Sequence, residues 1–188
     1  MNMKTMNQAQ FTENQGVITL QAKAKSDFIV SPDTKQITAN AAFIYEEVQG
    51  DFILQARVRH SFTSTYDAAA LFAYESDNLW AKAAYECSDF GTKTVVSVMT
   101  NKISDDANGV NLTQDYVWLQ LLRKGDVFAV HYSLDGEYYE LSRVCSLPLA
   151  DTLKVGFVAQ CPLGEGSVTE FSSIQMMHKT VTDIRKGK

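Results

Sequence analysis

Three residues of types suited to ligand binding occur in the segment LWAKAAYEC, separated by even numbers of positions: Trp80, Lys82 and Glu86. In a β-strand this spacing places all three side chains on one face. An indole ring stacks on the apolar side of a sugar ring, while an ammonium and a carboxylate bind its hydroxyl or acid groups. The pattern predicts binding of a carbohydrate or another polar small ligand. The alternative is that Trp80 packs under a loop and that the two charges only cover a solvent-facing sheet.

Residues of neighbouring segments are expected to join this face. Asp67 comes just before the preceding apolar run and Arg123 ends a later one, and both side chains can hydrogen-bond hydroxyl groups. We expect residues 101–115, NKISDDANGVNLTQD, to form a loop beside the sheet. Asn101 and Ser104 would then lie at the rim of a cleft.

His131 is the remaining candidate for ligand binding. In FAVHYS it lies on the opposite strand face from Phe128 and Val130, which are expected to face the core. His131 would then face outward, onto an exposed or concave surface. There it could act as a base, although a histidine without a matched serine or cysteine is more often a satisfied surface group.

Catalysis has less support in the sequence than binding. A glycoside hydrolase needs two carboxylates across the scissile bond, and Glu86 and Asp67 are the pair we nominate for a weak hydrolase. Motifs of nucleotide hydrolases, serine esterases and zinc proteases do not occur. We therefore expect no catalytic residue and no cofactor. Residues 101–115 contain oxygen ligands suited to calcium, but they lack EF-hand spacing, so a solvated loop without a metal is expected.

Composition limits the classes of partner. The 188 residues have a net charge of −5 and no dense basic stripe, which argues against nucleic acid. No secretory signal and no apolar run of about 20 residues is present, so we expect a cytoplasmic protein that does not bind membranes. The three cysteines are too widely spaced for a zinc knuckle or a disulfide framework. A thiol nucleophile would need one of only three histidines as its partner.

The hydrophobic pattern predicts an almost entirely β fold. Apolar residues alternate or form short blocks, and turn residues interrupt them about every ten positions, as in a two-sheet sandwich or a barrel. Lys124-Gly125 and Asp135-Gly136 are expected to link three strands into a meander. We expect one domain over 1–188, with an ordered core at about 11–178 and fraying ends. The expected strands are 17–22, 26–29, 38–45, 50–60, 68–74, 79–87, 93–100, 116–124, 127–133, 137–144, 152–160 and 167–177.

Four segments of the chain resemble a known family when taken in order. They are TYDAAALFAYESDNLWAKAAYE, VVSVMTNKISDDANG, WLQLLRKGDVFAVHYSLDGEYYELSRV and VGFVAQCPLGEGSVTEF. Together, over roughly Ser26 to Met177, they resemble the regulation-of-enolase-like family, a domain of unknown function with a concanavalin A-like fold. The chain departs from that pattern at Ala68 to Ala70, where a Gln and a Gly are common, and at Asp106, where a Trp is common.

The resemblance implies a jelly-roll of two curved antiparallel sheets. Lectins and glucanases share this architecture and bind sugars on the concave sheet, so it supports carbohydrate binding by analogy. The acidic strand motif Glu-x-Asp-x-x-Glu, which such glucanases use, does not occur in this sequence. The family name also suggests a different class of function, a protein-interaction module that regulates a metabolic enzyme.

Overall fold

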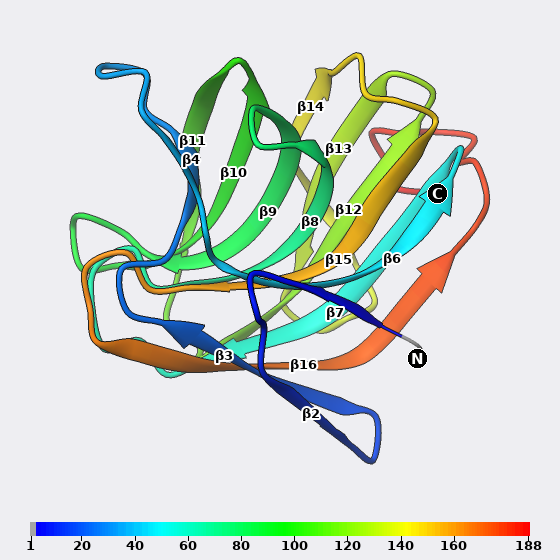
Figure 1. Ribbon diagram of the computed structural model, residues 1–188. Helices are drawn as coiled ribbons and strands as arrows, with labels where there is room; N and C mark the ends of the chain where they lie inside the picture. The colour runs from blue at the N-terminus through cyan, green and yellow to red at the C-terminus, as the bar shows by residue number, and fades with distance from the viewer. Residues whose placement is uncertain (1–2) are drawn as a thin grey trace.

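The computed structural model describes residues 3–188 and shows a sandwich of two seven-stranded antiparallel sheets (Figure 1). The first sheet has the order β1-β6-β15-β8-β9-β10-β11, and the second has the order β14-β13-β12-β7-β16-β3-β2. The strands of the first sheet are Lys4–Met6, Ala42–Gln49, Thr152–Gln160, Ala68–Ser76, Leu79–Cys87, Lys93–Asn101 and Ile103–Leu112, in that order. Those of the second are Glu140–Ser146, Val127–Ser133, Tyr116–Lys124, Phe52–His60, Gly166–Met177, Val17–Lys23 and Phe11–Asn14. The predicted all-β jelly-roll sandwich is confirmed.

The main core lies between the two sheets and follows from strand alternation. In β9, Ala81, Ala83 and Tyr85 point inward, and they meet inward residues of the second sheet such as Leu119 and Val58. Every other residue of these strands therefore faces the opposite sheet, as a period of two requires. The predicted partition of the β9 side chains between two faces is confirmed.

A second apolar layer covers the outer face of the first sheet. It is formed by the segment around the hairpin of β4 (Phe28–Val30) and β5 (Ile37–Ala39). The Phe28 ring lies 4.8 Å from Phe72 and 6.3 Å from Phe43, measured between ring centroids. Strands β8 and β9 are thus buried on both faces. Burial on both faces explains why β8 reads as a nearly continuous apolar run, AAALFAYES.

Most predicted strands are confirmed, and β9, β12, β13 and β15 have the predicted bounds. The prediction of a loop at 101–115 is wrong, because β11 (Ile103–Leu112) pairs with β10 there. β11 is an edge strand of the first sheet and most of its residues are exposed, so it lacks the apolar alternation that identifies a strand. The stretch predicted as one strand at 38–45 is divided between β5 and β6.

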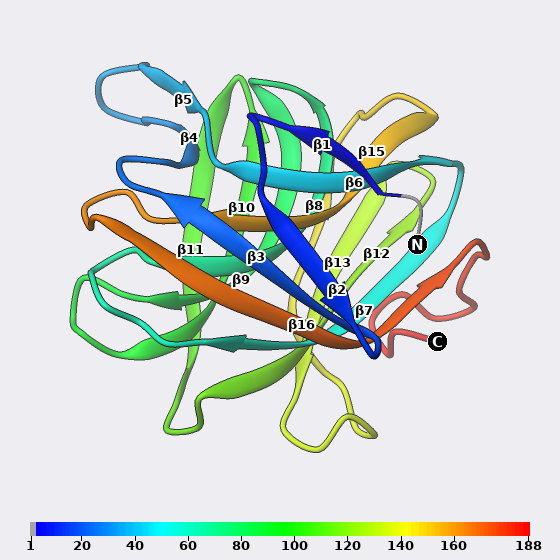
Figure 2. The same cartoon turned by 60° about the horizontal axis from the view of Figure 1, so that its bottom comes forward.

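Both ends of the described chain make ordered contacts where fraying was expected. β1 pairs with β6, and β2 pairs with β3. The C-terminal segment crosses the outer face of the second sheet, where Val181 is buried against Ile53, Leu122 and Ala129. Figure 2 shows this segment in red beside β7 and β12. Within residues 3–188 no helix is long and apolar enough to span a bilayer.

Candidate functional site

Trp80, Lys82 and Glu86 share the outer face of the first sheet, as their spacing predicts. Trp80, however, is fully buried under the layer that Phe28 completes. Its Nε1 donates a hydrogen bond to the Asp77 carbonyl at 3.2 Å, and its ring centroid lies 5.3 Å from that of Phe72. With its polar group satisfied and its faces covered, Trp80 supports the core of this face and is not available for stacking on a ligand.

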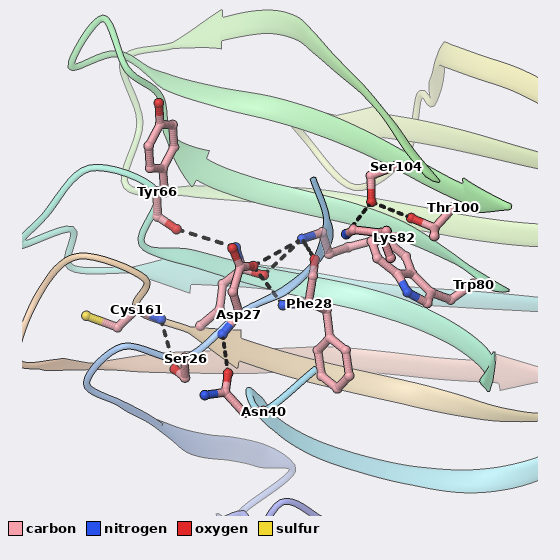
Figure 3. A network of polar contacts seen from close by, with 12 residues as sticks. Ser26, Asp27, Phe28, Asn40, Tyr66, Trp80, Lys82, Thr100, Ser104 and Cys161 are labelled. Atoms are coloured by element: carbon pink, nitrogen blue, oxygen red, sulfur yellow. Dashed lines mark hydrogen bonds and ion pairs between the residues drawn. The ribbon is translucent and has the colours of Figure 1, made fainter. Parts of the chain in front are cut away.

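Lys82 binds the covering segment to the sheet. Only 2% of the residue is exposed, and Nζ donates to the Phe28 carbonyl and to Gln160 Oε1, both at 3.0 Å (Figure 3). Asp27 Oδ1 lies 3.8 Å from the same nitrogen. Burial raises the pKa of Asp27, whereas the Lys82 charge lowers it. These contacts satisfy the buried ammonium, as a charge removed from water requires.

Ser104 has a similar structural role, and Asn101 does not. Ser104 Oγ accepts a hydrogen bond from the Val30 amide at 2.9 Å and lies 2.7 Å from Thr100 Oγ1 (Figure 3). Ser104 therefore connects β11 to the covering segment. Asn101 is exposed at the end of β10.

Asp67 is fully buried and shapes the loop that precedes β8. Its Oδ2 accepts hydrogen bonds from the Thr63 amide, the Thr63 hydroxyl and the Ser64 amide at 2.9–3.0 Å. The preceding residue, Tyr66, has a φ of 66°, a left-handed conformation that is unusual for a residue other than glycine. The Tyr66 amide donates to the Cys87 carbonyl at 2.7 Å. Asp67 thus positions Tyr66, while its Oδ1 is buried without a hydrogen-bond partner among residues 3–188.

Arg123 and His131 belong to the second sheet, so the structure does not bring them together with Trp80. The Arg123 guanidinium donates to the carbonyls of Gly125, Ala150 and Leu149 at 2.7–3.1 Å and thereby fixes the connection to β15. His131 faces away from the main core, as alternation predicts. The C-terminal segment nevertheless buries it, with Nε2 3.0 Å from the Arg185 carbonyl oxygen.

One part of the predicted face is open, and we call it the acidic pocket. It is a cavity of about 260 Å³ lined by Tyr66, Glu86, Asp89, Asp106 and Asn108. Strand register explains how distant residues meet here. Val98 of β10 pairs with Lys82 on one side and with Asp106 on the other. Of these residues the sequence pattern indicates only Glu86 for ligand binding; it places Asp106 and Asn108 in a loop because the polar pattern of β11 does not indicate a strand.

Glu86 is the unusual group of the acidic pocket. It is only 7% exposed, and its carboxyl group has no hydrogen-bond partner among residues 3–188. Burial raises the pKa of Glu86 to about 8; Lys82 opposes this shift, while Asp106, Asp27 and Asp89 add to it. Burial likewise raises the pKa of Asp106. At neutral pH Glu86 therefore retains its proton in most molecules and can donate a hydrogen bond as well as accept one.

The structure does not bring together Glu86 and Asp67, the two carboxyl groups nominated for a weak glycoside hydrolase. Such an enzyme needs two carboxyl groups that face one substrate. Glu86 lines the cavity, but Asp67 is buried outside it with three hydrogen bonds to Oδ2. Among residues 3–188, no three side chains of His, Cys, Asp or Glu are grouped so that they could hold a metal ion. The arrangement can hold a polar ligand by hydrogen bonds.

Comparison with known sequences identifies related proteins. Residues 5–179 match the family described as "Protein of unknown function (DUF1349)". The chain is also 31% identical over 159 residues to a Saccharomyces cerevisiae protein named "Regulation of enolase protein 1". That match covers 84% of this chain and 79% of the yeast protein.

Solved structures show the same fold. A functionally unknown protein from Saccharomyces cerevisiae has a TM-score of 0.88 at 27% identity, over 95% of this chain and 97% of that one. The carbohydrate binding module CBM66 from Bacillus subtilis has a TM-score of 0.60 at 11% identity, over 93% and 94%. The GH43 protein BlXynB from Bacillus licheniformis has a TM-score of 0.67 at 12% identity, over 90% of this chain but only 34% of that one. At such identities the last two comparisons show the fold alone.

Proposed function

The chain belongs to the family described as "Protein of unknown function (DUF1349)", so its function must be inferred from its own geometry. We propose that it is a non-catalytic protein that binds a carbohydrate or another polyhydroxylated small ligand in the acidic pocket. The observation that carries this proposal is the Glu86 carboxyl group. It is more than nine-tenths buried, lines a cavity and has no hydrogen-bond partner among residues 3–188. The Glu86 carboxyl oxygens are not among the fully buried, unpaired atoms of residues 3–188, so they are accessible from the cavity and a ligand there can hydrogen-bond to them.

The other lining residues suit hydroxyl groups. The carboxyl oxygens of Asp89 and Asp106 accept hydrogen bonds, and the Asn108 amide both donates and accepts. Tyr66 is 39% exposed and could place its ring against the apolar side of a sugar. Its backbone is fixed by hydrogen bonds to Cys87 and Gln160, so little conformational entropy would be lost when a ligand binds. The carbohydrate binding module of the same fold supports the proposal by analogy only.

Isothermal titration calorimetry with neutral mono- and disaccharides tests this function. We expect Glu86→Leu to weaken binding at least about tenfold, because a buried donor and acceptor are lost, and Tyr66→Ala to weaken it as well. Glu165→Gln, a change at an exposed glutamate outside the pocket, is the matched control. Absence of binding across the panel, or equal affinity for Glu86→Leu and the unmodified protein, would reject the proposal. If a simple amine binds more tightly than any sugar, the proposed ligand class changes from a polyol to a cation.

A protein partner is the second candidate function, and two observations favour it. One is the name of the yeast relative, which suggests a regulatory contact with enolase. The other is Phe90, which is 81% exposed on a tight turn closed by the hydrogen bond from the Ser88 amide to the Thr92 carbonyl at 2.8 Å. An exposed aromatic side chain on a hydrogen-bonded turn is a common centre of protein interfaces. We expect purified enolase from the same organism to bind the domain, and Phe90→Ala to abolish that binding while Glu86→Leu retains it. If Phe90→Ala binds enolase as well as the unmodified domain, this candidate loses its structural basis.

A further inference from the structure

The outer face of the second sheet carries a row of polar and aromatic side chains. Gln55 and Arg57 of β7 point outward. The residues that alternate with them along the strand face the core, namely Leu54, Ala56 and Val58. Register places Trp118 of β12 opposite Arg57 and Gln120 opposite Gln55. The guanidinium carbon of Arg57 lies 3.9 Å from the ring centroid of Tyr116 and 5.4 Å from that of Trp118. The sequence pattern nominates His131 on this face for ligand binding, but the C-terminal segment buries it.

A pocket adjoins this row where two other segments meet the sheet. We call it the tail pocket, because the C-terminal segment forms one wall and residues 136–139 form another. Its volume is about 510 Å³, within the usual range for small-molecule sites and about twice that of the acidic pocket. The lining residues are Gln55, Gln120, Gly136, Glu137, Tyr138, Tyr139, Arg185, Lys186, Gly187 and Lys188.

Both walls are held in place by close packing. Gly136 has a φ of +83°, and a Cβ at this position would lie 2.8 Å from the Trp118 ring, so the loop lies directly on the indole. On the other side Gln120 Nε2 lies 3.4 Å from the Gly187 carbonyl oxygen, and His131 Nε2 lies 3.0 Å from that of Arg185. These contacts use the backbone of the C-terminal segment. The Arg185 and Lys186 side chains are therefore not needed to hold the wall in place.

The floor of the tail pocket is polar and nearly buried. Gln120 is 1% exposed, and its Oε1 accepts a hydrogen bond from Gln55 Nε2 at 2.5 Å. The floor is thus a pair of coupled amides. Above it Tyr138 is 77% exposed and could stack on a bound ring or chain.

The charge of the lining is opposite in sign to that of the whole protein. Three cations, Arg185, Lys186 and Lys188, face one carboxylate, Glu137, although the chain has a net charge of −5. Lys186 lies 3.7 Å from the Asp183 carboxylate, an exposed ion pair that offsets part of its charge. The Arg185 guanidinium has no ion-pair partner within the described part of the chain. A planar guanidinium of this kind suits bidentate binding of a carboxylate or phosphate.

We propose that the tail pocket binds a small anionic ligand, a phosphate or carboxylate group on a polar carbon skeleton. Arg185 and Lys186 would bind the anionic group, the Gln55 amide oxygen, which Gln120 holds in place, would bind a hydroxyl group, and Tyr138 would cover the skeleton. The site is separate from the acidic pocket, because the two lie on the outer faces of different sheets. It therefore does not depend on the proposed polyol function.

Calorimetry with glucose 6-phosphate, inorganic phosphate, citrate and glucose tests the proposal. We expect the phosphorylated sugar to bind more tightly than glucose, and the double change Arg185→Gln with Lys186→Gln to weaken its binding at least about tenfold. Lys179→Gln removes an exposed cation of the same segment that does not line the pocket, and it is the matched control. Glu86→Leu should leave this binding unchanged, which separates it from the acidic pocket.

Several results would overturn the proposal. The proposal is rejected if no anionic probe binds, if the double variant and the control bind with equal affinity, or if binding requires a long acidic peptide. The single change Lys186→Gln provides a second test should the double variant unfold, and it should weaken binding by a smaller factor that grows at low ionic strength. Equal affinity for this variant at every ionic strength would also reject the site.

Discussion

Glu86→Gln should change how the stability of the protein depends on pH. Folding raises the pKa of Glu86 from 4.5 to about 8, so between these values the folded state binds a proton that the unfolded state has lost. The contribution of Glu86 to stability is therefore fully present below pH 4.5 and is lost as the pH rises through 8. Glutamine has the shape of the protonated side chain and cannot ionise, so the variant lacks this loss.

The size of the effect follows from the two pKa values. Each pH unit inside the window changes the free energy of unfolding by about 1.4 kcal/mol, and the full span corresponds to at most about 5 kcal/mol. Between pH 5.5 and 7.5 we expect Glu86→Gln to gain about 2 to 3 kcal/mol over the unmodified protein. Titrating groups that do not interact with Glu86, such as His60, are present in both proteins and cancel in the difference.

Urea unfolding at pH 5.5, 6.5 and 7.5 and constant ionic strength measures this difference from the transition midpoints and slopes. Glu165→Gln, at an exposed position, should show no such trend. A stability difference between Glu86→Gln and the unmodified protein that stays constant from pH 5.5 to 7.5 would refute the reasoning. It would mean that Glu86 is ionised in the fold and stabilised by Lys82, and the acidic pocket would lose its hydrogen-bond donor.

Three further predictions concern buried polar groups. Lys82→Met should lower the free energy of unfolding by about 3 kcal/mol or more, because the Phe28 carbonyl and nearby acceptors lose a buried cation; urea unfolding measures this, and a loss below about 1 kcal/mol would contradict it. Arg123→Met should cost about 2 to 4 kcal/mol by leaving carbonyls such as that of Leu149 unpaired; an unchanged melting temperature would argue against this role. His60, whose pKa burial lowers to about 4, should stay neutral in NMR titrations down to pH 5, so its contribution to stability falls as the pH drops from 6.5 towards 4; a midpoint near 6.5 would show that the ring is accessible to water.

The sequence determines the sheets more clearly than the site, for a physical reason. Alternation in β9 separates Trp80, Lys82 and Glu86 from the main core, because one face of every strand must meet the other sheet. Alternation does not show what lies on the second face. Phe28 comes from a segment about fifty residues earlier, and its burial over Trp80 depends on tertiary packing that no local pattern reveals.

The strand β11 illustrates the second limit. Its sequence, ISDDANGVNL, is polar because it lies at the edge of the first sheet and most of its residues face solvent. Without that strand, Asp106 belongs to a loop of unknown position. With the strand in register, Asp106 falls in one row with Val98 and Lys82 and lines the same cavity as Glu86. The candidate ligand residues therefore become neighbours only through the least strand-like segment of the fold.

A segment outside the two large sheets covers part of each outer face of the sandwich. The β4–β5 segment covers the first sheet, and residues around Val181 cover the second. In both cases a pocket remains beyond the covered area, and side chains distant in sequence meet there. Such places combine a rigid sheet floor with polar loop residues, whereas the sheet centres are filled with apolar side chains. The same construction accounts for two pockets of opposite charge on one β-sandwich. It also explains why a ligand for either pocket must be sought among molecules that match the rim residues, Tyr66 and Asp89 for one and Tyr138 and Arg185 for the other.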